Sequence, residues 1–244
     1  PPFSIADEKI DVHDEIRATY RYLDIRRDEI KAKLLMRSKA TNVIRNYLCD
    51  QMFAEVETPI LTKSTPEGAR DYIVPSRVHP HHFYALPQSP QIYKQLLMIS
   101  GMDRYYQIAR CFRDEDLRAD RQPEFTQVDI EMSFNSQEDI IKMAEGLMID
   151  LWKDCKNIEL KPPFKRASYK ECMEKYGTDR PDLRFGMEFV NVESIAKRSS
   201  FSIFQGALER GNIIRAICVP NGASLSRREI DELTSFTSQF GLAG

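Results

Sequence analysis

A strict alternation of polar and apolar residues marks the stretch TQVDIEMSF at positions 126–134. Successive side chains of a β-strand point to opposite faces, so this pattern predicts a strand with one apolar and one polar face. The polar face carries Gln127, Asp129, Glu131 and Ser133. In most proteins such a face lies in water, and this is the plain alternative to a functional interpretation.

A second strand is predicted at residues 105–112, and the polar segment 113–123 would join the two as the long arm of an antiparallel hairpin. The face of this strand that would extend the polar surface is mixed rather than uniformly charged. It carries Gln107, Ala109, Cys111 and Arg113. The paired strands would then make a floor of acids and amides with a guanidinium at one edge. Such a floor suits a small zwitterion beside a phosphate. Carboxylates bind an ammonium group, and a guanidinium donates two parallel hydrogen bonds to phosphate oxygens.

Helices are predicted on both sides of this hairpin in the sequence. An apolar stripe without Gly or Pro favours a helix over residues 28–49, and a strand is predicted to follow at 53–58. Ser89 and Pro90 are typical of a helix start, with Ser89 as the N-cap, and Gly101 is typical of the end of that helix. A further helix is predicted over 137–154 with Ser136 as its cap, and a short one ends near Gly177.

These elements predict an α+β fold, in which an antiparallel sheet is flanked by helices and followed by the start of a small α/β insertion. From position 187 onward, short apolar runs are separated by Gly, Asn and Ser. The predicted domains are an opening segment at 1–22, a core at 23–186 and the incomplete start of an inserted domain at 187–244.

Composition narrows the possible classes of protein. The chain has 244 residues and a formal net charge of −2, so any RNA contact must come from local basic clusters. No apolar run approaches the ~20 residues of a membrane span, and the first residues lack the pattern of a signal peptide. The five cysteines are irregularly spaced, which indicates reduced thiols rather than a disulfide framework or a zinc site. His79, His81 and His82 crowd together, but the intervening proline favours an exposed loop over a metal site.

Three polar segments could carry chemistry or could be ordinary surface. Gln91 and Lys94 share a face of their predicted helix. Residues 65–72 form a turn-rich loop whose glycine could act as the hinge of a lid. The arm between the hairpin strands is longer than most hairpin loops, and its Arg118 and Arg121 could contact RNA phosphates. Neither a Walker nor a Rossmann glycine motif is present.

Taken in order, these segments resemble the class II aminoacyl-tRNA synthetases, and within them the bacterial-type aspartyl-tRNA synthetases. The likeness runs from YRYLDIRR at 20–27 to the end of the sequence. The helix at 28–49 with FAEVETP (53–59) is similar to motif 1, and CFRDE (111–115) with RQPEFTQ (121–127) is similar to motif 2. Motif 1 of the family usually has a glycine where Met52 or Phe53 stands, so the turn after the helix could differ here.

Three further stretches resemble the aspartyl enzymes in particular. They are STPEGARDY (64–72), which is similar to their flipping loop, LPQSPQIYKQ (86–95), which is similar to their aspartate-recognition segment, and YGTDRPDLR (176–184). Lysyl and asparaginyl relatives share the general shape of motif 2 but are not expected to have these first two stretches.

The resemblance implies a role for each candidate residue. Arg113 would be the catalytic residue, binding the α-phosphate of ATP and the aspartate carboxylate. Aspartate would be bound by Glu67, Ser89, Gln91, Lys94, Arg113 and Asp129. ATP would be bound by Arg113, Asp114, Glu115, Gln122 and Gln127. The acceptor end of tRNA would contact Arg118 and Arg121. No metal ligand is expected in this part of the protein, and Mg²⁺ would accompany ATP.

The implied function is that of an aspartate–tRNA ligase, which activates L-aspartate with ATP and transfers it from aspartyl-adenylate to the 3′ end of tRNA-Asp, or of tRNA-Asn as well. The family also implies a homodimer formed through motif 1, in a bacterial cytoplasm or an organellar matrix. Motif 3 and the OB-fold anticodon domain are not in this sequence, so we expect the chain to be inactive alone. Two alternatives stay open, a non-catalytic synthetase-like binding module and an asparagine synthetase of the same fold.

Overall fold

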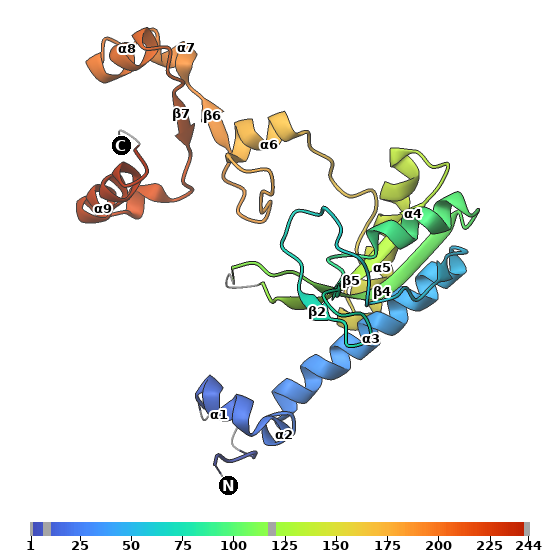
Figure 1. The fold of residues 1–244 in the computed structure, drawn as a ribbon. Helices are drawn as coiled ribbons and strands as arrows, with labels where there is room; N and C mark the ends of the chain where they lie inside the picture. The colour runs from blue at the N-terminus through green and yellow to red at the C-terminus, as the bar shows by residue number, and fades with distance from the viewer. Residues whose placement is uncertain (1, 7–10, 117–120, 242–244) are drawn as a thin grey trace. The chain divides into compact units, whose positions relative to one another are not determined.

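Residues 2–6, 11–116 and 121–241 are described by a computed structural model, drawn in Figure 1. Their contacts divide the chain into two compact units, Pro1–Phe164 and Lys165–Gly244. The second unit thus begins before the predicted boundary at residue 187, because helix α6 (Tyr169–Tyr176) packs on strand β6 (Phe189–Asn191). The assignment of the units to a synthetase core and an inserted domain stays a prediction.

The first unit contains the hairpin and the helices around it. Its helices are α1 (Asp14–Thr19), α2 (Arg21–Asp24), α3 (Asp28–Asp50), α4 (Gln91–Ile99) and α5 (Gln137–Lys156). Its strands are β1 (Ala54–Glu55), β2 (Ile73–Pro75), β3 (Phe83–Ala85), β4 (Arg104–Phe112) and β5 (Glu124–Met132). The predicted helices and hairpin are confirmed. The strand predicted at 53–58 is reduced to β1, because that segment pairs only with the beginning of β4.

The central sheet has the order β1-β4-β5. Strands β4 and β5 pair antiparallel over their whole length, from Arg104 opposite Met132 to Phe112 opposite Glu124. Strand β1 pairs parallel to β4. The sheet is therefore mixed, whereas the sequence predicted an antiparallel one. Strands β2 and β3 form a separate antiparallel ribbon. The α+β class is confirmed.

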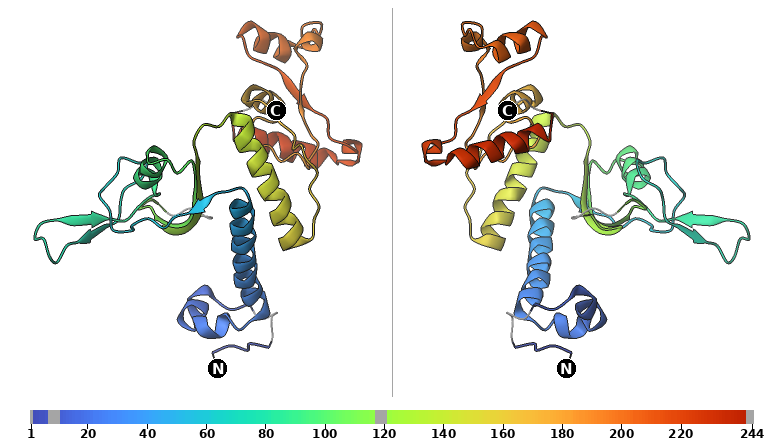
Figure 2. Two further views of the ribbon diagram at one scale, coloured as in Figure 1. Left: turned by 90° about the vertical axis from the view of Figure 1, so that its right-hand side faces the viewer. Right: turned by 90° about the vertical axis from the view of Figure 1, so that its left-hand side faces the viewer.

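The two faces of the β4–β5 hairpin have different neighbours. On one face α3 and α5 pack side by side, as Figure 2 shows. The core there consists of Leu48, Phe53 and Tyr106, and Ile130 and Met143 pack against it. The opposite face meets helix α4, which contacts both strands. The polar side chains of the hairpin therefore lie beneath α4.

Helix α3 ends in a left-handed turn at Met52, where φ is +66°. The Met52 N–H donates to the Cys49 carbonyl and the Phe53 N–H donates to the Leu48 carbonyl, both at 2.9 Å, which is the pattern of a Schellman motif. Phe53 and Leu48 also pack together in the core, as this motif favours. Having methionine in place of glycine therefore does not abolish the left-handed turn, which the core contact holds in place.

Replacing Met52 with glycine is expected to stabilise the protein by about 1 kcal/mol, because glycine adopts this conformation without the penalty of a β-carbon. The Met52 side chain is 81% exposed, so little burial is lost. Thermal unfolding followed by circular dichroism measures the change. Gln51→Gly is the matched control, since its φ of −85° gives glycine no advantage and stability should fall. A decrease in stability for Met52→Gly would contradict the assigned strain.

Helix α5 begins at the predicted cap. The Ser136 N–H donates to the Asp139 carboxylate at 2.8 Å, and the Asp139 N–H donates to the Ser136 hydroxyl at 3.4 Å, which together form a capping box. The Ser136 hydroxyl also donates to this carboxylate, at 2.7 Å, and that bond, with the one from the Ser136 N–H, holds the pKa of Asp139 below its usual value. Among the apolar residues of this helix, Leu147 is buried whereas Ile140 is exposed.

The second unit is built from short elements. Besides α6 and β6 it contains α7 (Glu193–Ala196), α8 (Ser202–Glu209), β7 (Arg215–Ile217), a 3₁₀ turn η1 (Gly222–Ser224) and α9 (Arg227–Ser238). Strands β6 and β7 pair antiparallel, with Phe189 opposite Ile217. Helix α6 ends at Gly177 as predicted, with a φ of +69°.

Two expectations from composition concern the chain as a whole. All five cysteines are free, which agrees with reduced thiols. Among the described residues, no helix has the length and apolar character needed to cross a membrane.

Candidate functional site

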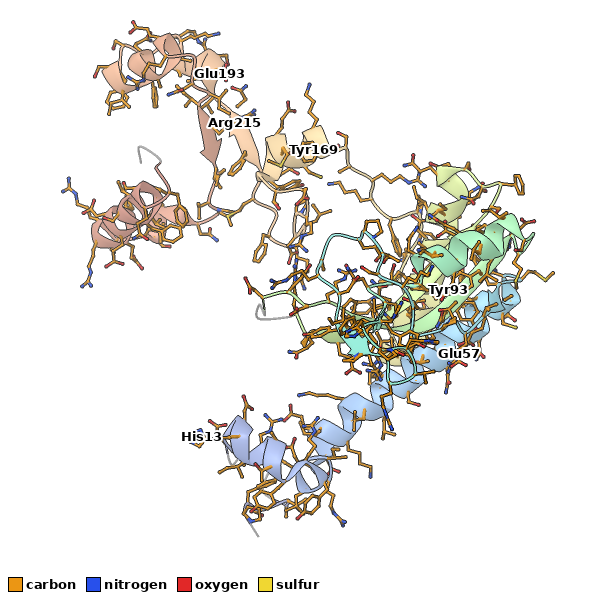
Figure 3. The ribbon with its side chains drawn as sticks, in the orientation of Figure 1. His13, Glu57, Tyr93, Tyr169, Glu193 and Arg215 are labelled. Atoms are coloured by element: carbon orange, nitrogen blue, oxygen red, sulfur yellow. The ribbon has the colours of Figure 1, made fainter. Side chains whose placement is uncertain are left out.

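The polar face of the β4–β5 hairpin is buried rather than solvated. Gln107 and Asp129 lie opposite each other and are each 8% exposed, and the neighbouring Ala109 and Cys111 are also buried. The plain alternative of a polar face in water is therefore wrong for this part of the sheet. In Figure 3, side chains crowd over this region, where Tyr93 of α4 is labelled. A buried polar floor needs hydrogen-bond partners, and α4 and the surrounding loops supply most of them.

Gln107 is held by two hydroxyl groups. Its Oε1 accepts a hydrogen bond from the Tyr105 hydroxyl at 2.8 Å and another from the Thr58 hydroxyl at 2.9 Å. Burial, with the charges of Asp129 and other acids nearby, raises the pKa of Tyr105. Tyr105 therefore stays protonated as a donor at neutral pH and fixes the amide of Gln107 in the floor.

Cys111 lies at the centre of the predicted site. Its Sγ donates a hydrogen bond to Gln127 Oε1 at 3.3 Å. Burial, helped by the carboxylate of Asp129, raises the pKa of Cys111 to about 11, so the thiol is not a nucleophile at neutral pH. The charged groups that influence this thiol are those of Asp129, Arg113, Glu67 and Lys94. Four predicted site residues from distant parts of the sequence thus lie near enough to this buried thiol for their charges to affect its pKa.

Lys94 reaches from α4 to the acids of the floor. Its Nζ lies 3.0 Å from Asp129 Oδ1 and 3.4 Å from Glu131 Oε2, and the Lys94 side chain is 13% exposed. Burial alone would lower the pKa of Lys94, but the hydrogen bond and charge of Asp129, with those of Glu131, more than offset it and raise this pKa. Lys94 is therefore an ammonium at neutral pH, with most of its side chain shielded from water.

Ser89 does not cap α4, contrary to the sequence prediction. Pro90 holds the N-cap position, and no side-chain hydrogen bond closes that end of the helix. The Ser89 hydroxyl instead donates to Glu67 Oε2 at 3.1 Å, and the Thr65 hydroxyl donates to Glu67 Oε1 at 3.3 Å. Ser89 thus ties the loop at 65–72 to the start of α4, where Gln91 lies half-buried as the first helical residue.

Gln88 anchors the same loop, although the sequence analysis predicts no role for it. It is 1% exposed. Its Oε1 accepts from the Ala69 N–H at 3.1 Å, and its Nε2 donates to the Ala69 carbonyl at 2.8 Å and to Asp71 Oδ1 at 2.5 Å. The amide therefore pairs with the loop backbone as a neighbouring strand would. A glutamine among turn residues carries no local signal for this, because its partners lie 17 to 19 positions away in the sequence.

Arg113 stands at the edge of the floor with part of its guanidinium unpaired. Its backbone N–H donates to the Pro123 carbonyl at 2.9 Å, and its guanidinium lies 5.1 Å from the centre of the Phe125 ring. Arg113 Nε is buried and has no hydrogen-bond partner among the described residues, and the same holds for Asp129 Oδ2. The floor therefore presents a free donor on a cation and a free acceptor on an anion.

Arg113 lines a pocket of ≈ 330 Å³. The pocket is lined by Arg113, Glu115, Asp116, Arg121, Gln122, Pro123 and Phe125. Two of these residues form an ion pair, with Arg121 Nη1 3.7 Å from Glu115 Oε2. The Asp114 N–H donates to the Arg70 carbonyl at 3.0 Å, so the motif 2 strand is joined to the loop at 65–72. Arg118 lies outside the described residues.

Metal ligands are not evident around this site. Within the ranges the structure describes, no group of three or more His, Cys, Asp or Glu side chains could hold a metal ion. His79, His81 and His82 lie on an exposed turn between β2 and β3, where the His82 ring Nδ1 is 2.9 Å from the Pro80 carbonyl oxygen.

Replacing Gln88 with leucine is expected to loosen the loop at 65–72, because the half-buried backbone groups of Ala69 lose their partners. Leaving such groups unsatisfied costs about 1–3 kcal/mol. Amide hydrogen exchange at Ala69 should accelerate by a factor of roughly ten or more. Gln95→Leu is the matched control, because Gln95 is an exposed glutamine on α4. Equal exchange rates at Ala69 in both variants would rule out the anchoring role.

Comparison with known proteins identifies the family of the chain. A family model described as tRNA synthetases class II (D, K and N) matches residues 13–232. The chain belongs to this family. Among solved structures, a candidate aspartyl-tRNA synthetase from Leishmania major Friedlin matches 64% of this chain and 31% of its own, with a TM-score of 0.56 at 23% identity. That match supports a shared fold.

Curated relatives in the family are similar over the whole chain. The aspartate–tRNA(Asp/Asn) ligases of Protochlamydia amoebophila (strain UWE25) and Geobacillus sp. (strain WCH70) are each 57% identical to it, and that of Desulfotalea psychrophila is 55% identical. Each match covers 100% of this chain but only 40 or 41% of the relative. The chain therefore spans about two fifths of the length of these synthetases.

Proposed function

We propose that this chain forms the aspartate- and ATP-binding part of an aspartate–tRNA ligase. The observation that carries the proposal is the pair of buried, unpartnered atoms on one face of the hairpin, Arg113 Nε and Asp129 Oδ2. Buried polar atoms nearly always have partners, so a free donor and a free acceptor on the same face of the hairpin favour a ligand that supplies both. An amino acid bound next to a phosphate has this combination of groups.

Aspartate would be bound by charges at three points. The free oxygen of Asp129 and the carboxylate of Glu67 would receive the α-ammonium, which a carboxylate holds well when water is excluded. Lys94 would receive the β-carboxylate. Ser89 and Gln91, at the start of α4, would complete the wall around the amino acid. A neutral asparagine amide would leave the buried ammonium of Lys94 without its counter-charge, which gives a physical basis for rejecting asparagine.

ATP would occupy the pocket beside Arg113, with Asp114, Glu115, Gln122 and Gln127 as further contacts. The α-carboxylate of aspartate would attack the α-phosphorus in line, and pyrophosphate would leave. Arg113 would stabilise the charge that develops on the phosphate oxygens, because a guanidinium fits two such oxygens at once. Mg²⁺ would accompany the nucleotide, held by its phosphates rather than by a cluster of protein ligands.

The acceptor end of tRNA is the proposed second substrate. Arg121 borders the nucleotide pocket, and Arg118 belongs to the same arm, so both are candidates for phosphate contacts. The curated relatives are named as ligases for tRNA(Asp/Asn), which supports tRNA-Asp, with or without tRNA-Asn, as the acceptor. A homodimer through motif 1 and a bacterial cytoplasm or organellar matrix complete the proposal.

Replacing Lys94 with alanine, in a full-length protein that contains this chain, is expected to lower kcat/KM for aspartate activation. The loss should be about 2–4 kcal/mol, or roughly 30- to 900-fold, because a buried charge pair loses one partner. Aspartate-dependent pyrophosphate exchange measures it. Lys153→Ala, which changes an exposed lysine of α5, is the control and should leave the rate unchanged. A Lys94→Ala enzyme with a normal rate would exclude this role.

Arg113→Ala is expected to weaken binding of a stable aspartyl-adenylate analogue by about 10- to 150-fold, the range for losing a charge-assisted hydrogen bond. Isothermal titration calorimetry on the same full-length protein measures the dissociation constant. Arg110→Ala is the matched control, since Arg110 lies three residues earlier, on β4, with its side chain half exposed and paired to Glu124 at 3.0 Å. If both variants bound the analogue as tightly as the unmodified protein, Arg113 would have no place in the site.

A further inference from the structure

Glu131 makes a contact for which the proposed binding of aspartate has no use. Its Oε2 lies 3.4 Å from Lys94 Nζ, the ammonium that would receive the β-carboxylate. Asp129 Oδ1 lies closer to the same ammonium, at 3.0 Å. Two carboxylates therefore already face one cation, and an incoming substrate carboxylate would be the third. Carboxylates that crowd one site repel each other, so full binding of aspartate favours the departure of one resident.

Asp129 is poorly suited to leave. Its side chain is 9% exposed. The side chain is short and lies on a paired strand opposite Gln107, so it has little room to move. It accepts the hydrogen bond from Lys94, and its other oxygen is already buried without a partner. Moving this carboxylate would leave the Lys94 ammonium without its nearest counter-charge.

Glu131 has the opposite properties. Its side chain is 35% exposed, so water is within reach when its torsion angles change. It is longer than Asp129 by one methylene group, and it lies one strand repeat further along the same face of β5. Ion pairs that are partly open to water are weak, because solvent replaces much of what the pair provides. Glu131 can therefore release Lys94 at small cost.

We propose that Glu131 is a placeholder carboxylate, which occupies Lys94 in the free protein and gives way to the β-carboxylate of aspartate. This inference rests on the proposed function. The exchange replaces one carboxylate by another, so the buried ammonium always has a counter-charge and α4 keeps its place before the substrate arrives. The arrangement also competes with the substrate and so limits affinity for aspartate.

A permanent positioning role would have the opposite consequence. If Glu131 stayed on Lys94 and so directed the remaining N–H of the Lys94 ammonium at the substrate, removing Glu131 would weaken aspartate binding. If Glu131 is a placeholder, removing it abolishes a competitor and strengthens binding. The sign of the change in affinity therefore separates the two roles, and damage to the fold does not imitate a gain in affinity.

The test is isothermal titration calorimetry of L-aspartate with a full-length protein that contains this chain. Glu131→Gln, which keeps the shape but removes the charge, should lower the Kd about two- to fivefold, the range expected when a partly exposed ion pair no longer competes. Glu131→Asp keeps the charge but shortens the reach to Lys94, and it should also lower the Kd. Glu124→Gln removes the same charge from the opposite face of the same strand and should leave the Kd unchanged.

An unchanged or higher Kd in Glu131→Gln and Glu131→Asp would overturn the placeholder role while leaving the proposed function intact. A gain in Glu131→Gln without one in Glu131→Asp, or an equal gain in Glu124→Gln, would assign the effect to net charge and overturn it as well. If the unmodified protein gave no binding of aspartate, the proposed function would fail and this inference with it.

Discussion

A buried ion pair between Lys94 of α4 and Asp129 of β5, 3.0 Å apart, connects the helix to the sheet and fixes the site between them. Removing one partner of such a pair typically costs ~3–5 kcal/mol, because the other is left charged and unpaired in a dry environment. Ser89, just before this helix, bonds to Glu67 and so brings the loop at 65–72 to the same place. Without the ion pair, the groups proposed to bind aspartate would lose their common frame.

The β4–β5 hairpin supports both the core and the site because its two faces are chemically different. One face packs Tyr106 against Leu48 and Phe53, where α3 meets the sheet. The other face carries the acids and amides. Strands held by a packed core are rigid, so the polar side chains on their second face keep their positions when a ligand is absent. The cost of burying those side chains is offset by the hydrogen bonds from α4 and the loops.

Loops close the site on the side away from the core. Gln88 pairs with Ala69, and the Asp114 N–H bonds to the Arg70 carbonyl, so the loop at 65–72 is tied both to the start of α4 and to the motif 2 strand. The residues proposed to bind aspartate and those proposed to bind ATP thus share one backbone connection.

The sequence by itself determined the elements and the faces on which residues lie. Alternation at 126–134 predicted the strand, its polar face and the grouping of Asp129 with Glu131, and the motifs indicated the family. Only the tertiary structure decided that this face is buried, that Ser89 bonds to Glu67 instead of capping α4, and that Gln88 anchors a loop. The physical reason is that periodicity is a local property, whereas these outcomes depend on partners far along the chain. Lys94 and Asp129 are 35 positions apart, and no local pattern states that they will meet.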